Sequence, residues 1–310
     1  MHEFDLIARI RARAALRGDV VLGIGDDCAL LAPPAGMQLA VTMDTLNVGV
    51  HFPADTVPYD IGWKALAVNL SDLAAMGAQP AWCTLSLSLP GADAVFLDGF
   101  TDGFLTLAKQ HDFALIGGDT TRGPLSISVT AHGLVAPGSA LRRTGAQVGD
   151  DVWVSGTLGD AAGALRQWQQ GDAMTPVLRE RLDRPIPRVA LGRALRGLAH
   201  ACIDISDGLL ADLAHICNSS GVGAQINVDA LPASAALREA FDVATCRVLQ
   251  ASGGDDYELC FTAPPVQRDM LHALSQTLNL PLTHIGEIVT GTGVCCAGVD
   301  VAAAGYQHFA

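Results

Sequence analysis

The stretch Val20-Val21-Leu22-Gly23-Ile24-Gly25-Asp26-Asp27 contains the pattern that decides the fold. Three consecutive apolar residues predict a short strand, and the glycines that follow predict a tight turn. The turn ends in two adjacent carboxylates. This segment therefore predicts a strand that delivers acidic side chains to a loop.

Helical and extended segments alternate on both sides of this turn. Apolar residues recur at helical spacing over residues 4–16, and residues 38–42 predict a strand that ends at Asp44. Pro58 predicts the start of a helix that continues to Gly77, because a proline in the first turn gives up no intrahelical hydrogen bond. The same alternation continues to the end of the chain, which predicts an α/β fold.

The length of 310 residues predicts two domains, each large enough to bury a core. A break in composition at Ala136-Pro137-Gly138 precedes a polar stretch, so we place the domain boundary there. The predicted domains are residues 1–138 and 139–310.

Composition excludes some classes of partner. The formal net charge is −13, with 32 acidic residues against 19 Lys and Arg, so we expect no nucleic acid partner. A phosphate ligand would then need bound cations, of which Mg²⁺ is the natural candidate. No apolar run is long enough to span a bilayer, and the eight cysteines form no CxxC pair. We therefore expect a cytoplasmic protein that binds no membrane.

Acidic residues recur in apolar or glycine-rich surroundings, where an unpaired carboxylate is costly to bury. Magnesium offers one explanation, since it binds carboxylate and phosphate oxygens. A structural role in turns or helix caps is the alternative for most of them, and for Asp72, within a helix, a partner such as Lys64. The residues concerned are Asp26, Asp27, Asp44, Asp72, Asp119, Asp204, Asp207, Asp255 and Asp256.

Two common nucleotide-binding motifs are missing. The sequence contains no GxxxxGK[ST], and the turn at Gly23–Cys28 lacks the third glycine of the dinucleotide fingerprint. A P-loop enzyme is therefore excluded, and a dinucleotide site has weak support.

Five strings resemble, in order and over essentially the whole chain, the motifs of the thiamine-monophosphate kinase family. The strings are Gly23-Ile-Gly-Asp-Asp-Cys-Ala-Leu-Leu31, Lys64-Ala-Leu-Ala-Val-Asn-Leu-Ser-Asp-Leu-Ala-Ala-Met-Gly77, Leu115-Ile-Gly-Gly-Asp-Thr-Thr-Arg-Gly-Pro124, Ile203-Asp-Ile-Ser-Asp-Gly-Leu209 and Ser252-Gly-Gly-Asp-Asp-Tyr-Glu-Leu259. This family shares its fold with aminoimidazole ribonucleotide synthetase and selenophosphate synthetase.

The resemblance implies a set of site residues. The metal ligands for several Mg²⁺ ions would be Asp27, Thr42, Met43, Asp44, Asp72, Asp119, Asp204 and Asp207. The ATP contacts would be Gly118, Asp119, Arg143 and Ser206, and the residues that line the thiamine-phosphate pocket would be His51, Asp255 and Tyr306. Arg143 and Asp207 would take part in catalysis.

Two positions depart from the family pattern. Met43 stands where the family commonly has a hydroxyl residue, so only its backbone carbonyl could bind a metal. Asp255 stands where the family commonly has glutamate, and its reach is shorter by one methylene group.

The resemblance also implies an architecture and an activity. The fold would be two α/β domains, with N-terminal strands forming a β-barrel across a homodimer and the C-terminal domain completing the substrate site. The activity would be ATP-dependent phosphorylation of thiamine monophosphate by direct in-line transfer. The alternatives are another ATP-using enzyme of the same superfamily and a non-catalytic acidic module that binds metal or nucleotide.

Overall fold

The computed structural model describes residues 3–15 and 17–299. The chain divides into two compact units. Unit 1 consists of Met1–Leu73 and Ala78–Gly138, and unit 2 of Ala74–Gly77 and Ser139–Ala310.

Unit 1 is built on a four-stranded sheet in the order β3-β6-β4-β5. The β3–β6 and β6–β4 pairs are antiparallel and the β4–β5 pair is parallel. The strands are β3 (Gln38–Asn47), β4 (Gln79–Leu89), β5 (Ala114–Arg122) and β6 (Ser126–Val135). The prediction that a strand ends at Asp44 was wrong, because β3 remains paired with β6 as far as Asn47.

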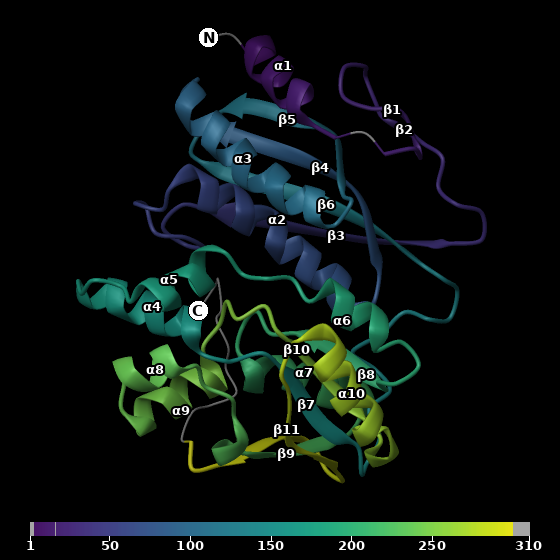
Figure 1. Ribbon diagram of the computed structural model, residues 1–310, viewed down its shortest axis with the longest axis vertical. Helices are drawn as coiled ribbons and strands as arrows, with labels where there is room; N and C mark the ends of the chain where they lie inside the picture. The colour runs from purple at the N-terminus through teal and green to yellow at the C-terminus, as the bar shows by residue number, and fades with distance from the viewer. Residues whose placement is uncertain (1–2, 16, 300–310) are drawn as a thin grey trace. The chain divides into compact units, whose positions relative to one another are not determined.

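Two helices, α2 (Pro58–Ala75) and α3 (Ala94–Gln110), lie side by side on one face of this sheet (Figure 1). Their backbones approach so closely that a Cβ on Gly103 would lie 1.9 Å from the carbonyl oxygen of Tyr59. A Cβ on Gly62 would lie 2.0 Å from the carbonyl oxygen of Phe100. Glycine on each helix therefore permits the crossing that places α2 over the sheet.

A smaller element packs on the sheet face that carries Trp82. It is the pair β1 (Val20–Leu22) and β2 (Leu30–Leu31), whose apolar side chains join a core cluster around Trp82. The indole Nε1 of Trp82 donates to Asp19 Oδ1 at 3.0 Å, and Arg17 pairs with Asp19 at 3.0 Å. These contacts fix the segment that carries Asp26 and Asp27. The first helix, α1 (Glu3–Arg13), is joined to α3 by the Arg9–Asp98 ion pair.

Unit 2 contains a six-stranded sheet in the order β12-β9-β11-β7-β10-β8. All neighbours are antiparallel except the β12–β9 pair. The strands are β7 (Asp151–Ser155), β8 (Ala201–Asp204), β9 (Gly223–Asn227), β10 (Leu259–Ala263), β11 (Leu282–Val289) and β12 (Gly293–Ala297).

Helix α7 (Leu209–Ser220) shares the main core of unit 2 with this sheet. A second, smaller core lies among four helices: α4 (Asp160–Gln170), α5 (Pro176–Asp183), α8 (Ala235–Ala240) and α9 (Val243–Ser252). The remaining helical segments are α6 (Val189–Ala194), α10 (Arg268–Leu278) and the 3₁₀ turns Val228–Ala230 and Pro265–Gln267.

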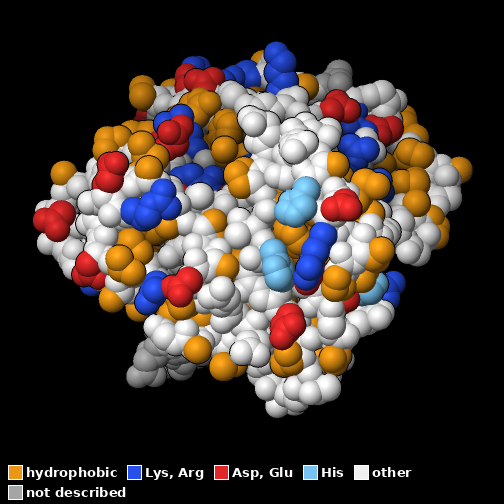
Figure 2. Space-filling view, turned by 60° about the horizontal axis from the view of Figure 1, so that its bottom comes forward, with side chains coloured by type: hydrophobic (Ala, Val, Ile, Leu, Met, Phe, Trp, Pro, Cys, Tyr) orange, Lys and Arg blue, Asp and Glu red, His pale blue; other side chains and the backbone are white. Residues whose placement is uncertain are grey.

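The predicted α/β class is confirmed in both units. Within the described part of this single chain, the unit 1 sheet is open and no closed barrel is formed. No helix over residues 3–15 and 17–299 combines the length and apolar character needed to cross a bilayer. Figure 2 shows a face on which basic and acidic side chains are interspersed and do not gather in stripes of one sign.

We expect Gly103→Ala to lower the free energy of unfolding by at least about 2 kcal/mol. Alanine favours a helix by about 1 kcal/mol over glycine, but the new methyl group would overlap a backbone carbonyl that cannot rotate away. Urea unfolding of the whole chain measures the difference. Gly91→Ala is the control, since a Cβ there meets nothing within 4 Å. Equal stability of the two variants would contradict this account of the crossing.

Candidate functional site

Strand β3 and helix α2 bring four polar side chains together in unit 1. Thr42 Oγ1 donates a hydrogen bond to Asp72 Oδ2. The backbone N–H of Asp44 donates to Asn69 Oδ1 at 3.2 Å, and Asn69 is fully buried. Strand alternation puts Thr42 and Asp44 on the helix-covered face, so hydroxyl, amide and carboxylate oxygens meet between β3 and α2.

The charge of Asp72 affects the titration of the neighbouring Asp44 in this cluster. Burial, and then the nearby charge of Asp72, raise the pKa of Asp44 to about 6. Two ionised carboxylates in a partly dry site repel each other unless a cation lies near them. The oxygen donors present are the kind that Mg²⁺ binds, so the cluster fits this ion.

Met43 belongs to the other face of the same strand. Its side chain is 62% exposed, and it alternates with the inward-facing Thr42 and Asp44. The side chain therefore takes no part in the cluster, and only the backbone of Met43 lies beside it.

Asp119 is remote from this cluster in the sheet. It lies on β5 in register with Ser86 on β4, whereas Asp44 is in register with Val129 on β6, which in turn aligns with Leu85. Asp119 therefore faces away from α2, and two strands separate β5 from β3. Three strand spacings amount to roughly 14 Å, so one chain does not bring Asp44 and Asp119 to the same ion.

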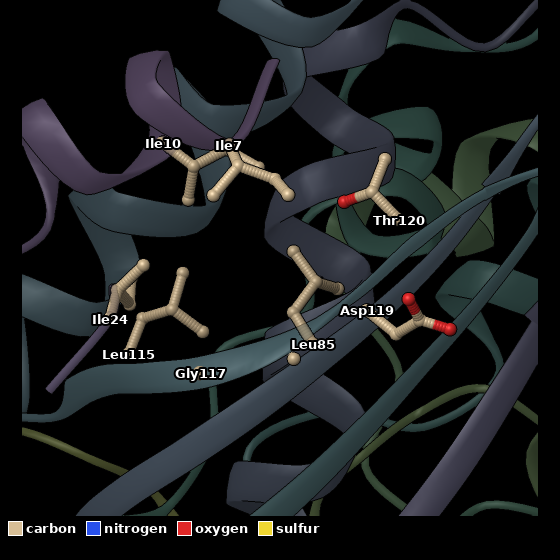
Figure 3. Close-up of a pocket in the computed structure, with 9 residues that line it drawn as sticks. Ile7, Ile10, Ile24, Leu85, Leu115, Gly117, Asp119 and Thr120 are labelled. Carbon is tan, nitrogen blue, oxygen red and sulfur yellow. The ribbon is translucent and has the colours of Figure 1, made fainter. Parts of the chain in front are cut away.

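Gly118 and Asp119 line a pocket of about 80 Å³ at the β5 edge. Figure 3 shows that isoleucine and leucine side chains surround it, with Asp119 and Thr120 to one side. Gly118 has φ +150°, and a Cβ there would lie 1.8 Å from the carbonyl oxygen of Leu85. The apolar side chains are Ile7, Ile10, Ile24, Leu85 and Leu115. The apolar lining with a carboxylate to one side is typical of part of a small-molecule site.

The other predicted residues of unit 1 lie in two loops. Asp27 is exposed between β1 and β2, where its N–H donates to Asp26 Oδ1 at 2.9 Å. His51 follows β3, and its Nδ1 accepts from the N–H of Asn47 at 3.0 Å. The buried Lys64 donates to the carbonyl oxygen of His51 at 2.9 Å and so fixes this loop to α2.

In unit 2 a single carboxylate organises the turn that holds three predicted residues. Asp204 ends β8 and is buried, and Ser206 and Asp207 follow it. One oxygen of Asp212, Oδ2, accepts from the N–H groups of Ser206, Asp207 and Gly208 at 3.1, 3.0 and 3.1 Å. Burial and the neighbouring Asp207 raise the pKa of Asp212 to about 7, although these N–H groups oppose the shift.

This turn is joined to the segment that carries Asp255. The N–H of Asp255 donates to the Ser206 carbonyl oxygen at 2.9 Å, and the N–H of Tyr257 donates to that of Ile205 at 2.8 Å. The N–H of Ile205 donates back to the carbonyl oxygen of Glu258 at 2.8 Å. The structure therefore brings Ser206, Asp207 and Asp255 together, although about 50 residues separate them in the sequence.

Two predicted residues are not tied to this turn. Arg143 is exposed, and its guanidinium has no hydrogen bond or ion pair among the described residues. Tyr306 lies outside the described residues. Over residues 3–15 and 17–299, no three His, Cys, Asp or Glu side chains gather closely enough to surround a metal ion.

Comparisons with known proteins give the family. Residues 25–135 match "AIR synthase related protein, N-terminal domain", and residues 147–295 match the corresponding C-terminal domain. A thiamine-monophosphate kinase of Salmonella typhimurium is 47% identical, over 99% of this chain and 98% of its own length. The chain belongs to the thiamine-monophosphate kinase family. The resemblance predicted from the five motifs is confirmed.

Solved structures of the family agree with this fold. A thiamine-monophosphate kinase from Stenotrophomonas maltophilia has a TM-score of 0.91 and 61% identity, covering 97% of this chain and 98% of that chain. AaThiL complexed with AMPPCP and TMP has a TM-score of 0.81 and 33% identity, covering 99% of this chain and 97% of that chain.

Sequence reasoning missed residues that hold the family motifs in place. Asp212 was not singled out, although an acidic residue in the first turn of the helix after Ser206-Asp207-Gly208 is a known signal for binding free N–H groups. Asn69 lies within a quoted motif, but nothing in the sequence shows that it contacts Asp44. Such pairings between distant segments become visible only in the folded chain.

We expect Asp212→Ala to lower the free energy of unfolding by about 2 kcal/mol, because three N–H groups lose their acceptor while the cost of burying a carboxylate is removed. Asp212→Asn, which keeps an oxygen acceptor, should lose less. Urea unfolding measures both changes. Asp269→Ala, an exposed first-turn position of α10, should change stability by less than about 0.5 kcal/mol. An Asp212→Ala protein as stable as this control would show that the carboxylate does not hold the turn.

Proposed function

We propose that this protein transfers the γ-phosphoryl group of ATP to thiamine monophosphate, giving thiamine diphosphate and ADP. The observation that carries the proposal is full-length similarity to thiamine-monophosphate kinases at 47% identity. It is supported by AaThiL, which was solved with AMPPCP, a non-transferring analogue of ATP, and with TMP. The eight cysteines form no disulfide among the described residues, which is consistent with a protein that functions in a reducing cytoplasm.

Unit 1 is proposed to bind ATP and Mg²⁺. Gly118 and Asp119 would contact the nucleotide, and the apolar pocket beside them suits the adenine ring. The ion ligands would be Asp27, Thr42, Asp44, Asp72 and Asp119, with the backbone carbonyl of Met43. The raised pKa of Asp44 next to Asp72 supports a cation at this cluster. When bound, Mg²⁺ offsets the charge of the phosphates.

Unit 2 is proposed to supply residues for the substrates. Ser206 would contact ATP, and Asp204 and Asp207 would bind metal. Asp255 carries a negative charge that suits the positively charged thiazolium ring of thiamine monophosphate. His51 in unit 1 and Tyr306 would complete the contacts to this substrate.

The chemistry needs little activation of the acceptor. A phosphate monoester has a second pKa of about 6, so an oxygen of thiamine monophosphate is already ionised near neutral pH. That oxygen forms a bond to the γ-phosphorus while the bond from phosphorus to the β–γ bridging oxygen breaks, and ADP leaves with the electron pair. The unpaired guanidinium of Arg143 is proposed to stabilise the charge on the transferring group.

A homodimer is proposed for two reasons. Strand β3 has one described neighbour, β6, and exposes apolar side chains on the face away from α2. Leu39, Val41 and Met43 are 52%, 57% and 62% exposed there. Edge strands with such faces commonly pair with another chain, which would allow the expected barrel. A second copy could also bring its Asp119 to the Asp44 cluster, a position that Asp119 of the same chain does not reach.

We expect purified protein with ATP, Mg²⁺ and thiamine monophosphate to form thiamine diphosphate, detected by chromatography, and to form little from free thiamine.

Asp72→Asn should remain folded but lower turnover by about two orders of magnitude or more, since the amide loses the charge that binds a cation. Asp93→Asn is the control, because asparagine also caps the start of α3. Failure of the folded wild-type protein to form product would overturn the proposed function.

We expect the protein to sediment as a dimer at micromolar concentration and Val41→Asp to sediment as a monomer, because the change puts a charge on the apolar face of β3.

Mixing two inactive variants tests whether Asp44 and Asp119 of different subunits form one site. Asp44→Asn and Asp119→Asn proteins, each nearly inactive, should regain activity when their subunits are exchanged, because one of the two sites then has both carboxylates. If both carboxylates served the site of their own chain, mixing would restore nothing.

A further inference from the structure

The segment that carries Asp255 has an unusual backbone. Asp255 has φ +66° and Tyr257 has φ +49°, both in the left-handed region. Aspartate adopts this region more readily than most residues, whereas an aromatic residue there is uncommon. Backbone strain of this kind persists only where surrounding contacts enforce it, and it is often found at ligand sites.

Main-chain contacts enforce this conformation on one side. The N–H groups of Asp255 and Tyr257 bind the carbonyl oxygens of Ser206 and Ile205, as described above. Between them, the carboxylate of Asp256 accepts from the N–H of Gly159 with both oxygens, at 2.9 and 3.0 Å. Each residue from 255 to 257 is therefore held by a bond to another part of unit 2.

A buried ion cluster holds the end of the segment. Glu258 is fully buried, and its carboxylate accepts from Arg181 at 2.7 Å and from Arg188. Ser155 Oγ donates to the same carboxylate and accepts from the N–H of Leu259 at 2.9 Å. A buried carboxylate with charged donors and a hydroxyl around it resists displacement, so the C-terminal end of the strained segment is held in place.

The consequence of this backbone is a contact between side chains two residues apart. The hydroxyl of Tyr257 donates to Asp255 Oδ1 at 3.0 Å. Tyr257 is only 9% exposed, so its ring is held by packing, while Asp255 is half-buried. A fixed hydroxyl on one oxygen restricts the rotation of the carboxylate and so sets its orientation.

We propose that Tyr257 is a positioning residue, whose hydroxyl orients the Asp255 carboxylate toward the cationic part of thiamine monophosphate. The inference rests on the proposed function of Asp255 and assigns to Tyr257 a role in substrate affinity. Tyr257 itself need not touch the substrate. Its loss should weaken binding of thiamine monophosphate and leave binding of ATP unchanged.

The test is Tyr257→Phe, which keeps the ring and removes the hydroxyl. We expect KM for thiamine monophosphate to rise roughly five- to tenfold, as for loss of one hydrogen bond to a charged group. KM for ATP should stay within about twofold, and kcat should change little. Tyr59→Phe, the same chemical change on α2, is the matched control and should leave both KM values unaltered.

A double-mutant cycle separates positioning from general loosening of unit 2. Asp255→Gly removes the carboxylate while accepting the positive φ, and should itself raise KM for thiamine monophosphate. In that background Tyr257→Phe should add nothing, because no carboxylate is left to orient. Additive effects, or equal rises in both KM values, would show that the hydroxyl acts only through stability.

The outcomes distinguish this inference from the proposed function. An inactive wild-type protein would overturn the kinase proposal and the inference with it. An active wild-type protein whose Tyr257→Phe variant has an unchanged KM for thiamine monophosphate would overturn the inference alone.

Discussion

The repulsion between Asp44 and Asp72 is the constraint on which unit 1 depends. The two carboxylates come from a strand and a helix, in surroundings dry enough to raise the pKa of Asp44 to about 6. Such a pair stays close only if strand β3 and helix α2 are held in place, and the contacts around α2 hold them. Its backbone meets α3 at two glycines without intervening side chains, and Asn69 ties it to the main chain of β3. Close helix packing thus maintains a charge arrangement that is unfavourable without a cation.

Unit 2 uses buried carboxylates in a different way. Asp212 and Glu258 are both almost fully buried, and each is surrounded by N–H or guanidinium donors. Their contacts set the backbone of the two segments that carry Ser206, Asp207 and Asp255. Asp212 and Glu258 are thus held by backbone or guanidinium donors, whereas Asp44 lies near a second carboxylate, Asp72.

Much of the fold could be predicted from sequence because its signals are local. Pro58 and Gly77 mark the limits of α2 to within two residues, and the order of motifs identifies the family. The extent of β3 could not be predicted, because Asp44 and Asn47 disfavour strands and only pairing with β6 keeps them extended.

The composition of the candidate site was likewise only partly visible in the sequence. The acidic residues could be selected because their sequence neighbours are apolar. Which of them lie together in the folded chain could not be predicted. That Asp119 faces away from Asp44 depends on sheet order and register, which no single motif contains. The bond from Tyr257 to Asp255 depends on two positive φ angles that residue type alone does not indicate.

Strand β3 carries two kinds of side chain on alternate residues, with the polar Thr42 and Asp44 on one face and an exposed apolar surface on the other. Inserting or deleting one residue inside this strand would turn Thr42 and Asp44 outward and Val41 and Met43 toward α2. Both faces would be lost at once, whereas the exposed turn before the strand, around Gly36, could change length without this inversion. The length of β3 is therefore far less free to vary during evolution than the length of the loop that leads into it.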